Sequence, residues 1–498
     1  MSSIYFAIYQ PRALSGRFEE ASQRLQKALA LCAERAQGAP FSFFAPMRAI
    51  EGGIGLDALR FPWVRARYEL AVAQVASAAR SASAHLFLPV WGNDGVEPMW
   101  CGPEGEGFRK LDAPVCLAPG LAVSTPQDLS GSVVWRFDAL HQCWNTGSAR
   151  PEADRRIWVE ASLAGGEADQ IYVGRSRLSS ADETVEADDF EEDLRWVRVE
   201  TRAEGTPSVI PADGRPARRV VLGDLRFRAA AAAIRDYVGA SRSSGIVLGL
   251  SGGVDSALVA ALAVEALGEE RVCALMLKSR FTSEESVRIA RETADGLGIR
   301  MEVRTIERLH EAAQAELALD VGRLPVGDIT DQNVQARLRA LWLMALSNRW
   351  GRLMLCTSNK AESAMGYGTL YGDLAGGFAP IADLWKREVR DLCLDFNRSQ
   401  SARRIPETVI FREPTAELRP NQRDSDSLPP YDRIERVMRA AMSAEFDPAC
   451  WGADDLSIVE RAASFAFKRR QCPLALRLSE TTLADFDLNY GVNRSIFG

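Results

Sequence analysis

The stretch at residues 248–262, LGLSGGVDSALVAAL, places a short polar loop between two apolar runs. The run at residues 245–250 contains β-branched residues, which favour a strand. The run at residues 257–267 is rich in alanine and leucine and predicts a helix. A strand, a glycine turn and a helix in this order expose backbone N–H groups at a helix N-terminus, where phosphates bind. The sequence therefore predicts an α/β unit that holds a phosphate.

The loop itself, SGGVDS, differs from both common nucleotide-binding loops. It lacks the Gly-Lys-Ser/Thr ending of a Walker A motif and the third glycine of a dinucleotide fingerprint. It contains Asp255, which would repel a phosphate unless a cation lies between them. We therefore interpret Asp255 as a Mg²⁺ ligand and Ser251 and Ser256 as phosphate donors. The alternative is a capped glycine turn before an ordinary buried helix.

The composition of the 498-residue chain is typical of a globular protein with two or three domains. Its formal net charge of −7 argues against nucleic acid as a partner. The first residues, MSSIYFAIYQPRAL, do not resemble a leader peptide, and no apolar stretch reaches the length of a membrane span. We expect a cytoplasmic protein with no nucleic-acid or membrane partner.

Cysteine and histidine do not form a recognisable site. The nine cysteines are scattered without Cys-x-x-Cys pairs, which fits neither a disulfide framework nor a zinc site. The three histidines, His85, His141 and His310, lie far along the chain from the glycine loop. Chemistry at the loop must therefore use Asp, Glu and Lys.

The chain is expected to form two domains. Residues 204–219, EGTPSVIPADGRPARR, are rich in Gly, Pro and Ala and predict a linker. We place one domain at residues 1–215 and the other at 216–498. Strands expected near residues 246–250, 271–276 and 353–356, with helices between them, predict a doubly wound α/β fold with a parallel sheet. Ligands bind such sheets beyond the carboxyl ends of the strands, where SGGVDS and TSNKAES follow.

Several long motifs of the second half resemble one family. They are DQNVQARLRALWLMALSN (331–348), CTSNKAESAMGYGTLYGDLAGGFAPIADLWKREV (356–389), PTAELRPNQRDSDSLPPYD (414–432) and FKRRQCP (467–473). Together with SGGVDS and SRFTSEES (279–286), they resemble NAD synthetase of the glutamine-dependent type. The loop SGGVDS resembles that of the ATP pyrophosphatase superfamily, the adenine nucleotide alpha hydrolase-like fold.

This resemblance implies a two-step ligase reaction with ATP and Mg²⁺. The nicotinate carboxylate of deamido-NAD attacks the α-phosphate of ATP, and ammonia then displaces AMP to form NAD. The ATP-binding positions that it implies are Gly249, Leu250, Ser251, Gly252, Gly253, Val254, Asp255, Ser256 and Thr357. The positions that it implies for deamido-NAD are Asn333, Glu362, Tyr367 and Lys468. Asp255 and Glu362 are the implied metal ligands.

Two further residues are candidates for catalysis. Lys386 matches the family's phosphate-contacting lysine; without the motif, it would be a solvated surface lysine. Asp373 in YGDLAGG could take a proton from ammonium, although Asp before a glycine-rich segment also favours a turn. Glu362 could instead be a helix N-terminal acid that complements the helix dipole.

The resemblance also implies a homodimer or higher homo-oligomer in which a neighbouring subunit supplies Asn333. The apolar residues of the 331–348 motif fit an interface helix or a core helix of a monomer equally well. Two other functions remain open. One is amidation of a different carboxylate by the same chemistry, and the other is a non-catalytic binding subunit.

The first half resembles a shortened nitrilase-like domain, which in this family releases ammonia with a Glu-Lys-Cys triad. Met47 follows Ala45-Pro46 where the family has glutamate, and a thioether cannot act as the base. Lys110 matches the lysine, but neither Cys116 nor Cys143 lies in the expected context. We therefore expect an inactive first domain and an ammonia-dependent enzyme, with a separate partner glutaminase left open. The rival interpretation is an amidase with a changed nucleophile.

Overall fold

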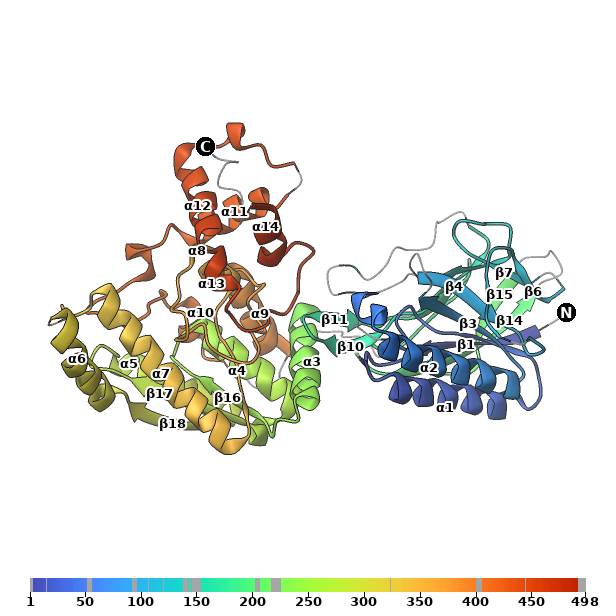
Figure 1. Ribbon diagram of the computed structural model, residues 1–498, viewed down its shortest axis with the longest axis horizontal. Coiled ribbons are helices and arrows are strands. Elements are labelled where there is room, and N and C mark those ends of the chain that lie inside the picture. The colour runs from blue at the N-terminus through green and yellow to red at the C-terminus, as the bar shows by residue number, and fades with distance from the viewer. Residues whose placement is uncertain are drawn as a thin grey trace. The chain divides into compact units, whose positions relative to one another are not determined.

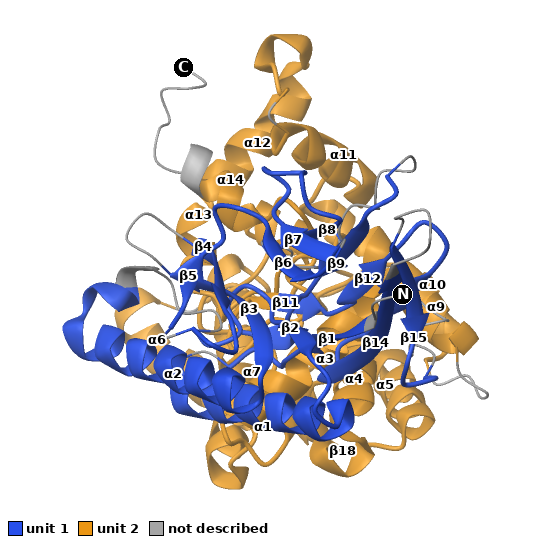
Figure 2. Ribbon diagram, turned by 90° about the vertical axis from the view of Figure 1, so that its right-hand side faces the viewer, with its two compact units in different colours: residues 1–167, 171–221 blue, residues 168–170, 222–498 orange. Residues whose placement is uncertain are grey.

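The computed structural model describes residues 3–14, 16–51, 56–91, 96–105, 107–119, 121–137, 142, 145, 154–201, 207–215, 225–322, 324–399, 405–443 and 445–490. The chain forms two compact units, residues 1–167 with 171–221 and residues 168–170 with 222–498 (Figure 2). The units change over after residue 221, whereas the sequence places the boundary after residue 215. Residues 216–224 lie outside the described part of the chain.

The chain before the second unit's helices forms two large sheets and one two-stranded sheet. The larger has the order β15-β14-β1-β2-β3-β4-β5, and β1, β2 and β3 are parallel, as expected of the opening strands. Its strands are β1 (Ser3–Gln10), β2 (Phe41–Phe44), β3 (Ala84–Trp91), β4 (Val96–Cys101), β5 (Arg109–Lys110), β14 (Asp193–Thr201) and β15 (Pro207–Pro211). The second sheet has the order β13-β12-β9-β8-β7-β6. Its strands are β6 (Val115–Ala118), β7 (Leu121–Ser124), β8 (Val133–Arg136), β9 (Ile157–Glu160), β12 (Arg177–Ser179) and β13 (Thr184–Glu186), and β10 (Ala164–Glu167) pairs with β11 (Gln170–Val173).

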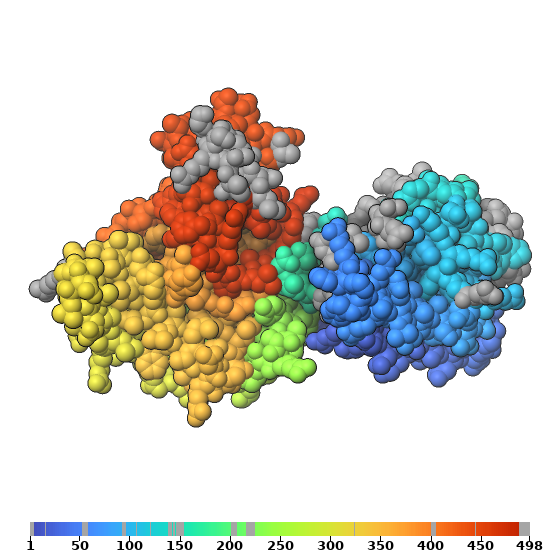
Figure 3. All heavy atoms as spheres, in the orientation of Figure 1, coloured from blue at the N-terminus to red at the C-terminus, as the bar shows by residue number. Residues whose placement is uncertain are grey.

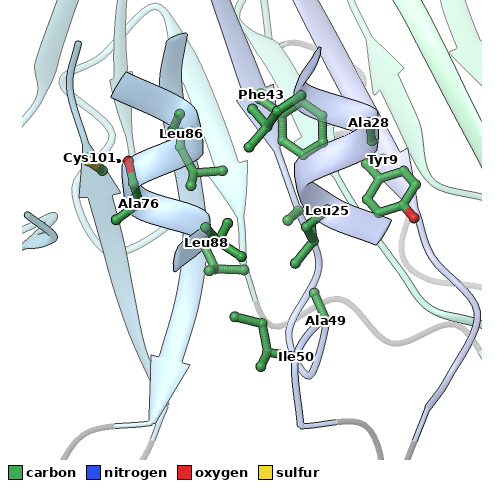
Figure 4. Packing of buried hydrophobic residues seen from close by; sticks show 14 of the residues in the cluster. Tyr9, Leu25, Ala28, Phe43, Ala49, Ile50, Ala76, Leu86, Leu88 and Cys101 are labelled. Carbon is green, nitrogen blue, oxygen red and sulfur yellow. Dashed lines mark hydrogen bonds between the residues drawn. The ribbon is translucent and has the colours of Figure 1, made fainter. Parts of the chain in front are cut away.

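The side chains of β1 alternate between two cores, as the period of a strand requires. Phe6 and Ile8 face the second sheet, where Phe44 and Phe87 stack with ring centroids 4.7 Å apart. Ala7 and Tyr9 face α1 (Phe18–Ala36) and α2 (Pro62–Ser81), in a core that also includes Leu25 and Phe43 (Figure 4). One layer of helices and the two large sheets therefore enclose the two cores of this unit.

The predicted linker is partly wrong. Residues 207–211 form the edge strand β15, which pairs antiparallel with β14 from Val197 to Thr201. Pro207 and Pro211 stand at its two ends, and proline is tolerated there because an edge strand needs fewer N–H donors. The high proline content therefore marks the edge of the sheet and not a free linker.

The second unit has the predicted doubly wound fold. Its sheet is parallel, in the order β18-β17-β16-β19, with strands β16 (Ile246–Gly249), β17 (Val272–Lys278), β18 (Arg300–Thr305) and β19 (Leu353–Met354). Three of these strands agree with the sequence prediction, and β18 adds a fourth. Val247 and Leu275 pack against Leu343 on one face of the sheet. Helices α3 (Leu225–Ala240) and α4 (Val254–Leu267) pack together, and α4 contacts strands β16 and β17 (Figure 1).

Helices make up most of the second unit. They are α3 (Leu225–Ala240), α4 (Val254–Leu267), α5 (Glu284–Leu297), α6 (Glu307–Val321), α7 (Ile329–Trp350), α8 (Lys360–Met365), α9 (Lys386–Ser399), α10 (Glu407–Phe411), α11 (Tyr431–Ala441), α12 (Ala453–Ser464), α13 (Ala466–Arg469) and α14 (Leu483–Tyr490). Short helical turns lie at Leu56–Arg60, Glu269–Arg271, Asp424–Asp426 and Pro448–Cys450. Helices α8, α11, α12 and α14 share a separate apolar core that includes Met365, Met438 and Phe486. No helix within the described ranges is both long enough and apolar enough for a membrane span.

Candidate active site

The glycine loop has the geometry that the sequence predicts. It follows β16, and α4 begins at Val254. Gly252 has a φ of +82°, and a Cβ atom there would lie 2.6 Å from the backbone oxygen of Ser286. Only glycine fits this position without displacing the neighbouring backbone. The hydroxyl of Ser256 accepts from the N–H of Ser251 at 3.2 Å and donates to the carbonyl of Gly253 at 2.9 Å, so it holds the turn in shape.

The loop borders a cavity of about 700 Å³. Of the residues that the sequence assigns to this site, all except Gly252 line the cavity. They are Gly249, Leu250, Ser251, Gly253, Val254, Asp255, Ser256, Asn333, Thr357, Glu362, Tyr367, Asp373, Lys386 and Lys468. The second unit therefore brings together side chains that are as much as 219 positions apart, from residue 249 to residue 468.

The charged groups of Asp255, Glu362 and Lys386 are in contact beside the glycine loop. The ammonium of Lys386 contacts Asp255 Oδ2 at 2.5 Å and Glu362 Oε1 at 3.4 Å. The Lys386 side chain is only 4% exposed, so the interpretation as a solvated surface lysine is wrong. Its ammonium also lies 5.2 Å from the ring centre of Tyr431, a cation–π contact.

Local capping places Glu362. Asn359 precedes α8, and its side-chain oxygen accepts hydrogen bonds from the N–H groups of Ala361 and Glu362. The Glu362 side chain accepts in return from the N–H of Asn359 at 3.4 Å, which completes a capping box. Asn359 Nδ2 donates to Asp255 Oδ1 at 2.9 Å. The helix-cap role of Glu362 is therefore real, and the same side chain also reaches Lys386.

Burial dominates the electrostatics of this cluster. It raises the pKa of Glu362 to about 8, and repulsion from Asp255 acts in the same direction. For Lys386, burial alone would lower the pKa, but attraction to Asp255 and Glu362 outweighs it and raises the pKa above its ordinary value. The two acids therefore favour the charged form of the lysine.

The two carboxylates fit a magnesium ion that is shared with a substrate. Mg²⁺ sites usually combine one or two protein carboxylates with phosphate oxygens and water. Asp255 and Glu362 both reach Lys386, so they are close enough to face one bound phosphate chain. Among the described residues, no group of three or more His, Cys, Asp or Glu side chains could hold a metal without such help.

Asn333 lies on α7 and accepts a hydrogen bond from Thr369 Oγ1 at 2.8 Å. It lines the same cavity as Asp373 and Lys468 of its own chain. That a neighbouring subunit supplies Asn333 to this site stays a prediction.

Asp373 and Lys468 both line this cavity. Burial raises the pKa of Asp373. Its Oδ1 accepts from the N–H of Thr369 at 2.9 Å, so the turn-forming role is also present. Lys468 donates to the carbonyls of Gly366 and Gly368, both at 2.8 Å.

Sequence reasoning missed three polar residues of the site. Asp424 is 6% exposed and accepts hydrogen bonds from Tyr431 at 2.7 Å and from Tyr367 at 3.2 Å. Arg339 lines the cavity from α7, and burial lowers its pKa to about 10. Asn359 could have been found, because Asn followed three residues later by Glu is a capping-box pattern. The other two lie inside recognised motifs, but nothing in the sequence pattern singles them out.

The first unit lacks the expected triad geometry among its described residues. Met47 follows β2 where the family has a glutamate. The Lys110 side chain is 55% exposed, and its Nζ lies 3.0 Å from Glu97 Oε1. Cys116 is exposed on β6, and its thiol contacts only the carbonyl of Ala118 in the contacts seen here. Cys101 is a core residue that points to the carbonyl of Ala76 (Figure 4). His141 and Cys143 lie outside the described residues.

Comparison with known proteins points to one family. The NAD synthase family matches residues 227–459. The glutamine-dependent NAD(+) synthetase of Thermotoga maritima is 35% identical over 358 residues, which cover 64% of this chain and 61% of that protein. The corresponding protein of Xanthomonas campestris pv. campestris is 42% identical over 281 residues, covering 56% of this chain and 50% of that protein. These matches thus span only about half to three fifths of the relatives' length.

Solved structures extend the similarity to both units. The glutamine-dependent NAD+ synthetase from Acinetobacter baumannii, in complex with ADP, aligns with a TM-score of 0.70 and 25% identity and covers 97% of each chain. The glutamine-dependent NAD(+) synthetase from Cytophaga hutchinsonii aligns with a TM-score of 0.73 over 97% of this chain and 96% of that chain, at 19% identity, and supports the fold alone. Residues 227–459 therefore match the NAD synthase family, and both units share the fold of these two glutamine-dependent NAD synthetases.

Proposed function

We propose that the second unit amidates deamido-NAD to NAD at the expense of ATP, through an adenylated intermediate. The observation that carries this proposal is the contact of Asp255, Lys386 and Glu362 beside the glycine loop. The match of residues 227–459 to the NAD synthase family supports the reaction class, and the ADP complex of the A. baumannii relative supports an adenine nucleotide as ligand.

In the first step, the nicotinate carboxylate attacks the α-phosphorus of ATP and pyrophosphate leaves. Both reactants are anions, so their repulsion must be offset before they meet. Mg²⁺, when bound, supplies divalent charge for this purpose. Lys386 supplies a fixed positive charge, and the N–H groups at the start of α4 face the departing pyrophosphate.

In the second step, ammonia attacks the carbonyl carbon of the adenylate, and AMP leaves with the bonding electrons of the C–O bond. Ammonium must lose one proton before the attack, and the amide loses another afterwards. Asp373 is the acceptor that we assign, because burial raises its pKa and it lines the same cavity as Asn333 and Lys468.

We propose ammonia as the nitrogen source, because Met47 replaces the base that a cysteine glutaminase needs. The second candidate is glutamine, and the names of the relatives from T. maritima and X. campestris favour it. A separate glutaminase is not needed in that case.

One assay decides between these candidates. Purified full-length protein receives ATP, Mg²⁺ and deamido-NAD with either ammonium or glutamine, and NAD and pyrophosphate are measured. We expect NAD with ammonium and none with glutamine. NAD and glutamate from glutamine alone would establish the second candidate, and no product from either would exclude deamido-NAD as the substrate.

The variant Asp255→Asn tests the role of the charge cluster. The change keeps the size of the side chain but removes the carboxylate that Lys386 contacts. We expect pyrophosphate release to fall by at least about 100-fold, the loss typical of one group that stabilises transition-state charge. The far-ultraviolet circular dichroism spectrum should stay unchanged. Pyrophosphate release at the original rate would remove Asp255 from the mechanism.

We also propose that the protein forms a homodimer or a larger homo-oligomer. Large apolar residues are exposed along α6 and α7, the yellow surface in Figure 3, including Leu319 at 80% and Leu341 at 56%. Sedimentation should show an oligomer that Leu341→Glu weakens, with Leu31→Glu on the first unit as a control. A monomer that is fully active at every concentration would contradict this proposal.

A further inference from the structure

The NAD synthase match ends at residue 459, yet described residues beyond it contact both ends of α8. This helix is six residues long and carries Glu362. A helix this short is not stable by itself in water, so its neighbours must determine where it lies. We call Arg469, Ser479, Thr481 and Asp487 the C-terminal clamp.

The first contact of the clamp holds the N-terminal end of α8. Lys360 is 1% exposed, and its ammonium lies 2.7 Å from Asp383 Oδ1. The same ammonium donates to Ser479 Oγ at 3.1 Å and to the carbonyl of Thr481 at 2.8 Å. It also lies 5.2 Å from the ring centre of Trp385. The ammonium therefore has two hydrogen-bond acceptors and one ionic partner.

Asp383 binds the same segment of the clamp with its other oxygen. Oδ2 accepts from the N–H groups of Leu478 and Ser479, both at 2.8 Å, and from Ser479 Oγ at 2.7 Å. Asp383 is 4% exposed and precedes Lys386 by three residues. Residues 478–481 are thus bonded at once to the start of α8 and to the segment that leads into α9.

The second contact of the clamp holds the C-terminal end of α8. The guanidinium of Arg469 donates to the carbonyls of Ser363 at 3.0 Å and Ala364 at 3.3 Å. Such bonds satisfy carbonyls that the end of a helix leaves free. Asp487 holds Arg469 in place, with Arg469 Nε 2.9 Å from Asp487 Oδ2. The two side chains are only 9% and 8% exposed.

We propose that the C-terminal clamp positions Glu362 and Lys386 for adenylation, a role that rests on the proposed function. Glu362 lies two residues after Lys360 and one before Ser363, so both ends of its helix are fixed close to it. Buried charges tolerate few arrangements, because each unpaired one is costly. The clamp residues do not line the cavity, and they act through α8 and Asp383.

Two variants test this proposal. Lys360→Met removes the ammonium and keeps a similar side-chain volume. Ser479→Ala removes only one hydroxyl and leaves the ion pair of Lys360 with Asp383 intact. We therefore expect this variant to fold. Ser457→Ala is the matched control, because this exposed hydroxyl on α12 bonds only to the carbonyl of Asp454 in the contacts described.

Turnover and binding should respond differently. We expect kcat for pyrophosphate release to fall by about 10- to 100-fold in Lys360→Met, the range typical of groups that orient a ligand-bearing side chain. Ser479→Ala should lower kcat in the same direction, and Ser457→Ala should not. The Kd of a non-hydrolysable ATP analogue should stay close to that of the unchanged protein, because the clamp does not touch the cavity walls from β16 and α7.

Hydrogen exchange tests the clamp without catalysis. In both clamp variants, the amides of α8 should exchange faster, and those of α5 should not change. If the unchanged protein makes no NAD, the proposed function fails, while faster exchange in α8 would still support the clamp. If Ser479→Ala keeps the original kcat and the original exchange in α8, and only its urea midpoint falls, the clamp is merely structural and the inference is wrong.

Discussion

At the residue scale, the candidate active site depends on one lysine that is shared by two acids. Lys386 meets Asp255 and Glu362 while it is almost fully buried. The charged form of Glu362 is disfavoured, because burial and then repulsion from Asp255 raise its pKa from 4.5 to about 8. A raised carboxyl pKa means that the folded protein binds this proton more tightly than the unfolded chain does.

This difference predicts how stability depends on pH. Between about pH 4.5 and about pH 8, the unfolded chain has lost the Glu362 proton and the folded chain retains it, so the contribution of this group to the free energy of unfolding falls as pH rises. Glu362→Gln cannot titrate. The free energy of unfolding of this variant, minus that of the unchanged protein, should therefore increase from about pH 5 to about pH 8 in urea titrations. A constant difference would mean that Glu362 titrates normally.

The sequence predicted these charged residues better than it predicted their partners. Asp255, Glu362 and Lys386 could be named because each stands in a motif. Asp424 and the Lys360–Asp383 pair were not predicted, because a buried ion pair depends on chain geometry between residues that are 23 positions apart. The structural roles considered for Glu362, a helix N-terminal acid, and for Asp373, a turn residue, are also present. Both side chains accept hydrogen bonds from nearby backbone N–H groups.

At the scale of elements, short segments carry the chemistry and longer ones hold them. The six-residue helix α8 begins with the capping box of Asn359 and Glu362, and the same asparagine also donates to Asp255. One side chain therefore both starts the helix and joins it to the glycine loop.

These two roles can be separated by substitution. Asn359→Ala should lower the free energy of unfolding by about 1 kcal/mol, the usual value of an N-cap, and should also lower turnover. Asn359→Ser keeps a capping oxygen but cannot reach Asp255 as an amide does. We expect the serine variant to recover stability in urea titrations without recovering turnover. Equal recovery of both would show that Asn359 acts only as a cap.

Elements were predictable where apolar residues decide their form. The strands at residues 246–249 and 272–278 are buried and were expected. Strand β18, with the sequence RMEVRT, was missed because it lies at the edge of the sheet and exposes its charged residues. Strand β15 was mistaken for a linker because edge strands accept proline. Edge strands have the weakest hydrophobic pattern in the sequence, because only part of their surface packs against the core.

At the scale of the whole molecule, the two units differ in what their residues can do. The second unit gathers its predicted site residues around one cavity. In the described part of the first unit, Cys32 and Cys101 are core residues, and burial raises the pKa of Cys32 to about 12. A thiol with so high a pKa does not become a nucleophile near neutral pH.

Thiol reagents should therefore spare ammonium-dependent turnover. Cys356, next to Thr357, is 3% exposed, and burial raises its pKa to about 12. Iodoacetamide at neutral pH should modify the exposed Cys116 and Cys450, as mass spectrometry can show, without lowering NAD formation from ammonium. Loss of that activity in step with modification of Cys356 would contradict this expectation, and Cys356→Ala would confirm the cause.

The buried ammonium of Lys386 offsets the negative charge of Asp255 and Glu362 without a bound metal ion. Proteins that gather carboxylates around a metal often fold only when the metal arrives, because the acids repel one another without it. Here the compensating charge is covalently attached, so Asp255 and Glu362 can be brought together during folding before any ion is present. Folding and metal loading are then separate events, and a chelator should stop turnover while leaving a folded protein that regains activity as soon as the ion returns.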